Sequence, residues 1–566
     1  MASISSISAI DLTPLPGKQY FNCEREWREE FIYFLLIDRF HDDTYRLPII
    51  GPARSFGINV PDNAFYGGNL RGITRQLDYI AGLGCTTIWL SPCFENNPNA
   101  YHGYNINNYL DIDPHFGSKQ DLIELVDQAH ARNMRIVLDV VINHSGDNWF
   151  YEGEGDSGSV KYFQDQLMPF GGWRREDRPI PIELRDENLY HRKGAINDSG
   201  WDSYPENQHG DPYTLKDFEN DDDGPGSALI NILIKTFCYW IREADIDGFR
   251  VDAIKHMGEL ACARFCSNVR EYAYALGKRG FFLFGELAVS DDDIYNRYIG
   301  SNTSRMDGNK TVFFGINSLL DFRLAKGDND NAGLRDVILG NAGPETLFNR
   351  LEAQANRALN RGEIGRYLVT FIDNHDNFWQ PHGRFGAQAN DAQIVAGVGF
   401  LLCALGTPCI YYGTEQGFSG SGGDNQIRES MFDLNNPGAN LQNPDSWIYM
   451  SIAAIAKLVK TYPPLRFGRM YYRPISGDGI HFGMPFGNEY TLAFSRILYS
   501  SEVLIAYNVS SQPRQDFILV DADIHPPGST MKMLYGGNYV VPVLGDGNGN
   551  AFVQLFLNGQ QFVVLG

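Results

Sequence analysis

Carboxylates, histidines and an arginine stand in this chain where short apolar runs end. Four such runs end in Asp139-Val-Val-Ile-Asn143-His144, Gly248-Phe-Arg250-Val-Asp252, Phe284-Gly285-Glu286 and Phe371-Ile-Asp373-Asn374-His375-Asp376. Carboxylates that crowd one cleft raise each other's pKa unless a cation offsets them, so one can stay protonated while another stays ionised. A protonated acid beside an ionised carboxylate is the pair that retaining glycoside hydrolysis requires.

The elements that must position these side chains follow a repeating pattern. Between residues 30 and 462, short β-branched or aromatic runs alternate with longer amphipathic segments, which is typical of βα units around a parallel sheet. Eight strands are predicted, over residues 31–37, 86–90, 136–142, 248–251, 281–284, 318–322, 367–372 and 408–412. Helices are predicted over residues 119–132, 228–244, 260–276, 334–359 and 391–405. Eight repeats fit an α/β fold, the closed (β/α)8 TIM barrel, whose catalytic groups sit at the carboxyl ends of the strands.

Two parts of the chain depart from this pattern. About 70 residues separate the third strand from the next helix, too many for a simple loop, so an irregular inserted subdomain is expected. After residue 464, short alternating strands separated by Gly, Asn and Pro turns predict an antiparallel β-sandwich, with strands over 490–495, 502–508, 516–520, 539–543 and 551–557. The expected domains are a barrel of residues 1–143 and 218–463, an insertion of residues 144–217 and a carboxyl-terminal domain of residues 464–566.

Composition excludes several classes of partner. The 566 residues carry 47 Lys plus Arg against 69 Asp plus Glu, and the formal net charge of −22 would repel nucleic acid and anionic membranes. No apolar stretch reaches the length of a membrane span. The eight cysteines follow no metal-ligand or disulfide pattern and are expected to be buried thiols. Residues 1–17 lack the features of a secretory signal, which favours the cytoplasm, although a trimmed secreted enzyme would look the same.

The four strand-end segments, in this order, resemble the signature regions of the α-amylase family, family thirteen of the glycoside hydrolases. The resemblance extends to further segments along the barrel, namely Ile37-Asp38-Arg39-Phe40, Gly84 to Pro92, Tyr101-His102-Gly103-Tyr104 and Gly406 to Glu415. It implies a barrel enzyme that acts on a neutral α-glucan or oligosaccharide.

The resemblance assigns chemical roles to three carboxylates. Asp252 would be the nucleophile that forms a covalent glucosyl–enzyme intermediate, Glu286 the acid that protonates the departing oxygen, and Asp376 a transition-state stabiliser. Arg250 lies two residues before Asp252 on the same strand, so both point to one side and Arg250 is expected to lower the pKa of the nucleophile. A retaining pair places the carboxyl groups of Asp252 and Glu286 roughly 5–5.5 Å apart.

The same resemblance predicts the residues that contact the sugar. His144 and His375 would bond hydroxyls in subsite −1, Tyr104 would stack under that ring, and His102 is a polar neighbour. Asp139 would orient Arg250. The pair Lys255 and His256 matches residues on the leaving-group side, although a solvated helix start is an equal interpretation of these two residues.

A structural calcium ion is the cofactor that the resemblance implies. Its predicted ligands are Asn143, Asp217 and the main-chain oxygen of His256, and calcium takes six to eight oxygens. The family often has proline where this chain has Lys216, which weakens the alignment of Asp217. The acidic run over residues 221–224 is more typical of helix capping than of a calcium loop.

Three functions are compatible with this sequence. The leading prediction is a retaining hydrolase of α-1,4-glucosidic bonds in starch, glycogen or maltooligosaccharides. The alternative is an α-glucan transglycosylase of the 4-α-glucanotransferase type, in which a sugar hydroxyl replaces water as the acceptor. The absence of a recognisable further carbohydrate-binding module argues mildly against the larger cyclodextrin-forming architecture. The third is an inactive glucan-binding relative, against which the intact Asp252, Glu286 and Asp376 argue.

Overall fold

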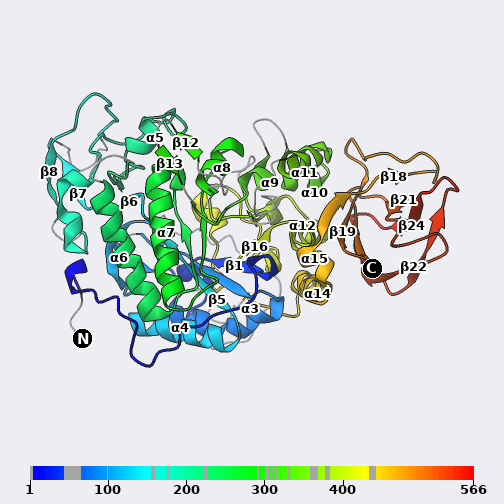
Figure 1. Cartoon of the computed structure of the whole chain (residues 1–566), viewed down its shortest axis with the longest axis horizontal. Helices are drawn as coiled ribbons and strands as arrows, with labels where there is room; N and C mark the ends of the chain where they lie inside the picture. Colours follow the sequence, from blue (N-terminus) through cyan, green and yellow to red (C-terminus); the bar gives the residue numbers. More distant parts are fainter. Residues whose placement is uncertain are drawn as a thin grey trace.

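The computed structural model describes most of the chain and shows an elongated molecule with a barrel at one end and an antiparallel sheet at the other (Figure 1). The described residues are 4–43, 65–98, 100–153, 160–174, 178–221, 226–289, 292–299, 305–307, 310–312, 315–327, 332–356, 368–376, 383–432 and 441–566.

All eight predicted barrel strands are present, and each pairs in parallel with its neighbour in the sequence. They are β1 (Ile32–Leu35), β2 (Thr87–Leu90), β5 (Arg135–Val140), β10 (Gly248–Val251), β11 (Phe282–Gly285), β14 (Ser318–Leu319), β15 (Val369–Thr370) and β16 (Thr407–Tyr411). A single parallel bridge between Leu320 and Val369 joins the last two edges. The (β/α)8 barrel predicted from the sequence is therefore confirmed.

The strands are short and buried on both faces, which explains why they read as continuous apolar runs. Helices cover their outer surface. They include α2 (Leu70–Arg75), α3 (Leu77–Leu83), α4 (Lys119–Ala131), α6 (Gly226–Ala244), α7 (Glu259–Ala275), α8 (Asp292–Ile299), α9 (Phe322–Lys326), α12 (Asp391–Cys403), α14 (Trp447–Thr461) and α15 (Pro463–Phe467). Polar caps fix where helices begin: the Ser118 side chain accepts from Asp121 N, and the Asp121 carboxylate accepts from Ser118 N.

One helix prediction is wrong in its extent. In place of a single helix over 334–359, the structure has α10 (Leu334–Leu339) and α11 (Glu345–Asn356), and residues 357–359 lie outside the described part. Gly340 ends α10 in the left-handed conformation with φ of 76°, which favours glycine, and Pro344 precedes α11. The Gly and Pro were visible in the sequence, but the apolar periodicity runs through both helices.

The segment after β5 is irregular, with short elements only. These are β6 (His144–Ser145), β7 (Trp149–Tyr151), β8 (Phe170–Trp173), α5 (Glu206–His209), β9 (Lys216–Asp217) and the 3-10 turns η3 (Ile182–Arg185) and η4 (Glu187–Leu189). β6 pairs with β9 in the antiparallel sense, with His144 opposite Asp217. The two ends of this long segment therefore lie side by side at the barrel.

The carboxyl-terminal region forms nine antiparallel strands around a core of its own. The sequence predicted β19 (Thr491–Leu498), β20 (Ser501–Asn508), β21 (Arg514–Val520), β23 (Val540–Gly545) and β24 (Ala551–Leu557). It did not predict β17 (Arg469–Tyr472), β18 (Ile475–Ser476), β22 (Thr530–Tyr535) or β25 (Phe562–Leu565). This sheet packs on α12 and α15 of the barrel (Figure 1).

Further short elements complete the described chain. They are η1 (Ile7–Ala9), η2 (Trp27–Glu29), α1 (Ile37–Phe40), β3 (Phe94–Asn96), β4 (Ile106–Ile112), η5 (Ile254–His256), β12 (Arg305–Asp307), β13 (Lys310–Val312), η7 (Phe385–Ala387), η8 (Thr414–Gln416) and α13 (Asp424–Ile427). Seven of the eight cysteines are buried thiols, as expected, and Cys23 is half-buried. Among the described helices, none combines the length and apolarity needed to cross a membrane.

Candidate active site

Arg250 lies at the centre of the carboxyl-end mouth of the barrel and is fully buried. The strand register places it opposite Asp139 on β5. Its Nη1 donates to both oxygens of Asp139, at 2.9 and 3.0 Å, and to Oδ1 of Asp252. Its Nη2 lies 2.9 Å from Oε2 of Glu286. One guanidinium therefore holds three carboxylates from three neighbouring strands together.

Main-chain contacts fix where the Asp252 and Glu286 side chains begin. Asp252 N donates to Val140 O at 2.9 Å, and Glu286 N donates to Val251 O at 3.0 Å, so each residue continues the sheet pairing by one step. Ala253 turns into the left-handed region with φ of 50°, and its N–H donates to Oε2 of Glu286 at 3.1 Å. The two carboxylates thus occupy set positions at the ends of β10 and β11.

Burial raises the pKa of Asp252 well above that of an ordinary aspartate. Arg250 opposes this increase, while the charges of Glu286 and Asp139 add to it. The expected contact of Arg250 with Asp252 is present, and its effect on the pKa of Asp252 has the expected direction. Burial outweighs that effect, and the sequence did not show how deeply the carboxyl group is buried. Burial likewise raises the pKa of Asp139 to about 6 against the opposing effect of Arg250.

Tyr104 and His375 form one wall of the mouth. Their rings stack with centroids 5.5 Å apart, and the Tyr104 hydroxyl lies 2.9 Å from His375 Nε2 and donates to Asp139 Oδ2 at 2.9 Å. Trp89 Nε1 donates to the same Asp139 oxygen at 3.1 Å. Asp139 therefore positions both Arg250 and Tyr104 through hydrogen bonds.

Asp376 is held by a residue that the sequence did not point to. Arg428 Nη2 donates to Asp376 Oδ1 at 3.1 Å, its Nε donates to His375 O at 2.9 Å, and its Nη1 lies 3.3 Å from the Tyr101 hydroxyl. Arg428 follows α13, in a loop beyond the last barrel strand, so no strand-end pattern marked it.

The other two predicted histidines also lie at this mouth. His102 Nδ1 accepts from Tyr104 N at 3.1 Å and its ring stacks on Tyr104, while His144 begins β6 directly after β5. Burial lowers the pKa of His102 to about 3 and that of His144 to about 4. Both rings are therefore neutral at neutral pH, and a neutral imidazole can donate to one hydroxyl and accept from another.

Lys255 and His256 lie in η5, just after Asp252, and both contact the inserted segment. Lys255 Nζ pairs with Asp202, and His256 Nδ1 donates to Asn207 O at 2.6 Å. Trp201 packs edge-on against His256 with centroids 5.5 Å apart.

Tyr213 is a second residue that sequence reasoning missed. Its ring packs against Trp201 with centroids 5.1 Å apart, yet the residue is 72% exposed. Partial burial, with the charges of Asp424 and Asp376, raises the pKa of its hydroxyl. Its φ of 61° is unusual for a non-glycine residue and turns the chain at this point. An exposed aromatic ring of this kind offers a flat apolar surface to a sugar.

The residues predicted to bind calcium come together in part. Asn143 and Asp217 are fully buried and touch, with Asn143 Nδ2 3.2 Å from Asp217 Oδ1. Asn220 Nδ2 donates to Asn143 Oδ1 at 3.2 Å, and the buried Asn220 Oδ1 accepts no hydrogen bond from the described residues. Buried oxygens of these three side chains suit a hard cation such as Ca²⁺. The structure gives no contact between the His256 main-chain oxygen and this group.

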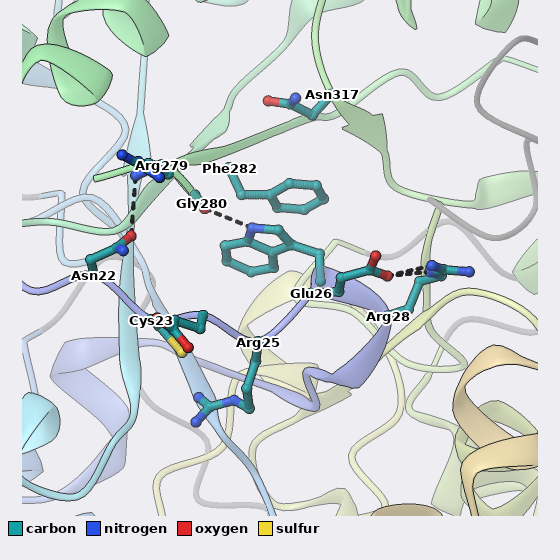
Figure 2. A pocket seen from close by; sticks show the side chains of 11 residues that line it. Asn22, Cys23, Arg25, Glu26, Arg28, Arg279, Gly280, Phe282 and Asn317 are labelled. Atoms are coloured by element: carbon teal, nitrogen blue, oxygen red, sulfur yellow. Dashed lines mark hydrogen bonds and ion pairs between the residues drawn. The ribbon is translucent and has the colours of Figure 1, made fainter. Parts of the chain in front are cut away.

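A cavity of about 510 Å³ lies at the opposite end of the barrel, near the start of β11 (Figure 2). Its lining includes Trp27, whose ring stacks on Phe282 at 4.0 Å and whose Nε1 donates to Gly280 O at 2.8 Å. Glu26 and Arg28 pair at its rim. These polar groups bond to one another and lie at the end of the barrel away from Asp252 and Glu286. We therefore assign no reaction to this cavity.

A closed parallel barrel with cation-bridged carboxylates at its carboxyl-end mouth defines a (β/α)8 glycoside hydrolase. Residues 34–447 match the family model described as the α-amylase catalytic domain. The chain therefore belongs to the α-amylase family.

Individual relatives include enzymes named for two activities. The α-amylase of Streptomyces lividans is 29% identical over 87% of this chain, which spans 56% of that protein. The cyclomaltodextrin glucanotransferase of Klebsiella oxytoca is 27% identical, with 82% of this chain and 70% of that protein covered.

Solved structures share the fold over nearly their whole length. The α-amylase from Geobacillus thermoleovorans, complexed with acarbose, superposes with a TM-score of 0.69 at 25% identity, covering 96% of this chain and 99% of that one. A cyclomaltodextrin glucanotransferase with a three-domain ABC distribution gives 0.69 at 24% identity, covering 94% and 98%.

Proposed function

We propose that this protein hydrolyses α-1,4-glucosidic bonds of starch, glycogen or maltooligosaccharides with retention of configuration. The observation that carries the proposal is the Arg250 guanidinium between Asp252 and Glu286. It contacts both carboxyl groups, which could then act on one glycosidic bond, and Asp376 is held by Arg428 at the same mouth. The α-amylases among the relatives support the substrate class.

The proposed reaction proceeds in two displacements. In the first, an ionised Asp252 oxygen forms a bond to the anomeric carbon while the bond to the leaving oxygen breaks, and that oxygen takes a proton from Glu286. In the second, Glu286 takes a proton from water, whose oxygen replaces Asp252 at the same carbon. The mechanism requires a separation of roughly 5–5.5 Å between the two carboxyl groups.

Substrate contacts follow from the walls of the mouth. The stacked Tyr104 and His375 rings would face the sugar in subsite −1, with the neutral His102 and His144 available to its hydroxyls. Lys255, His256, Trp201 and Tyr213 would contact the leaving-group side. Asn143, Asp217 and Asn220 would hold calcium, the structural ion that the family generally binds.

A transglycosylase is the second candidate, and the exposed Tyr213 ring favours it. An apolar surface on the leaving-group side can hold an incoming sugar and keep water from the intermediate. The cyclomaltodextrin glucanotransferases among the relatives support this alternative.

A product profile distinguishes the two candidates. The protein is incubated with maltoheptaose and with starch, in calcium and in chelator, and the sugars are resolved over time. Shorter oligosaccharides with a matching increase in reducing ends indicate hydrolysis. Products longer than the substrate, or cyclic glucans, without matching reducing ends indicate transfer.

Substituting Glu286→Gln tests the assignment of the acid. The change removes the titrating proton and keeps the shape, so we expect turnover to fall by at least about 10³-fold with an unchanged unfolding midpoint. Activity equal to that of the parent protein would refute the mechanism, and loss of the folded state would be visible in the midpoint. Loss of activity in this variant also argues against an inactive relative.

A further inference from the structure

Two histidines and an aspartate face one another in the inserted segment, outside the catalytic mouth. His191 follows η4, His209 ends α5 and Asp221 follows β9. His191 Nε2 lies 3.5 Å and His209 Nε2 lies 3.4 Å from the same oxygen, Asp221 Oδ1. The two imidazole rings stack with centroids 4.5 Å apart.

These separations fit the spacing of ligand atoms around one metal ion. The candidate ligand atoms of the three residues all lie within 4.8 Å of one another. Zinc binds imidazole nitrogen and carboxylate oxygen at about 2.0–2.2 Å in a tetrahedron, which places neighbouring ligand atoms about 3.3–3.5 Å apart. The two distances to Asp221 match that spacing, and they are longer than ordinary N–H···O hydrogen bonds.

The surroundings orient His191 as metal-binding histidines are oriented. Its Nδ1 bonds the buried carboxylate of Asp217 at 2.5 Å, which turns Nε2 toward His209 and Asp221. A histidine that binds a metal commonly donates its other nitrogen to a carboxylate in this way. Both Nε2 atoms are buried and make no hydrogen bond to the described residues. His191 itself is 3% exposed.

We propose that His191, His209 and Asp221 bind a divalent transition-metal cation of the zinc type. Glu219, whose carboxylate oxygen lies 3.7 Å from His191 Nε2, or a water molecule would supply the fourth ligand. Two nitrogen ligands distinguish this site from the oxygen ligands of Asn143, Asp217 and Asn220, because calcium prefers oxygen.

A bound ion would stabilise the leaving-group side of the active site. It would tie α5 to the segment after η4 and to the chain that follows β9. Asn207 lies on α5, and its carbonyl accepts from His256. Metal binding would therefore hold His256 in place without touching the reacting carboxylates.

Zinc titration of the full-length protein in excess calcium tests the proposal. We expect calorimetry to show one equivalent of Zn²⁺, and Co²⁺ at the same site to give the visible absorption bands of a tetrahedral nitrogen–oxygen complex. His209→Gln and Asp221→Asn are each expected to weaken Zn²⁺ binding by at least about tenfold and to abolish those bands.

An exposed histidine gives the matched control. His481 pairs with Asp478 on the surface and belongs to no cluster of metal-binding side chains in the described part of the chain, so His481→Gln should leave Zn²⁺ stoichiometry and affinity unchanged. Unfolding midpoints in calcium alone check that each variant is folded, and Asp221→Asn decides the matter if His209→Gln does not fold. Absence of Zn²⁺ binding by the parent protein, equal affinity in Asp221→Asn, or displacement of Zn²⁺ by equimolar Ca²⁺ would overturn the proposal.

Discussion

Arg250 contacts three carboxylates at once, so the charges of Glu286 and Asp139 act on the ionisation of Asp252. In the proposed mechanism Asp252 must be ionised to attack, so its raised pKa predicts that activity is lost as the pH falls through that raised value rather than near the value of a free aspartate. Asp139 raises the pKa of Asp252 by its charge and shares Arg250 with it.

Replacing Asp139→Asn should move the acidic limb of kcat/KM to lower pH. The substitution removes a like charge and leaves Arg250 to Asp252 and Glu286, and both effects lower the pKa of Asp252. The measurement is kcat/KM across the acidic range, whose midpoint is independent of the absolute rate. If the pH midpoint of the acidic limb is unchanged or higher, Asp252 does not govern the loss of kcat/KM at low pH.

Arg428 should matter for kcat more than for KM. Arg428→Lys keeps the charge but cannot make three bonds to Asp376, His375 and Tyr101 at once. Displacement of Asp376, the proposed transition-state stabiliser, is expected to lower kcat by about 10²-fold, with a much smaller change in KM. Arg132→Lys, in an exposed pair with Asp78, should change neither.

The predictable part of the site consists of residues at strand ends. Asp252, Glu286 and His375 follow buried apolar runs, and the barrel dictates that such ends meet. Arg428, Tyr213 and His191 lie in loops whose paths depend on tertiary packing, so neither periodicity nor spacing marked them. The distance between the carboxyl groups of Asp252 and Glu286, and the catalytic role of each residue, stay predictions.

At the scale of helices and strands, the periodicity of apolar residues predicted some elements and missed others. The eight barrel strands were predictable because strands buried on both faces read as apolar runs. Strand β17 was missed because its four residues, Arg-Met-Tyr-Tyr, are too few to show a clear alternation of apolar and polar positions. The break between α10 and α11 was missed because Gly340 interrupts a periodicity that otherwise continues.

A side chain at Gly285, at the end of β11, should force its neighbours to shift. A Cβ there would lie 2.5 Å from Ile254 Cδ1 and 3.0 Å from Ile316 Cδ1, both buried. Gly285→Ala should displace Glu286 and cost about 1–3 kcal/mol of stability, seen as reduced kcat and a lower denaturant midpoint. Gly483→Ala is the control, because nothing lies within 4 Å of its Cβ position.

At the scale of the whole molecule, buried hydrogen bonds join the barrel to the carboxyl-terminal sheet. Arg496 on β19 is 1% exposed and donates to the carbonyls of Cys403 at 2.7 Å and Ala404 at 2.5 Å. Tyr507 adds a bond to Ile338 O at 3.0 Å. Since these bonds cross between the two parts, they couple the stability of one to that of the other.

Arg496→Met should weaken that coupling. The change leaves buried carbonyls without their donor, at about 1–3 kcal/mol for each, so the unfolding midpoint should fall and the barrel and sheet should unfold in separate transitions. Calorimetry measures both effects. Arg514→Met, which removes a pair with Asp516 inside the sheet, should keep a single transition; two transitions in both variants would contradict this role for Arg496.

The pairing of β6 with β9 sets how the inserted segment meets the barrel. With His144 opposite Asp217, a path of more than seventy residues returns to within one strand spacing of its start. The insertion therefore leaves the barrel and returns to it as the two strands of a hairpin would. Residues can be added, removed or exchanged beyond this strand pair without altering the register of β5 and β10. The inserted segment over the active site can therefore evolve independently of the barrel strands beneath it.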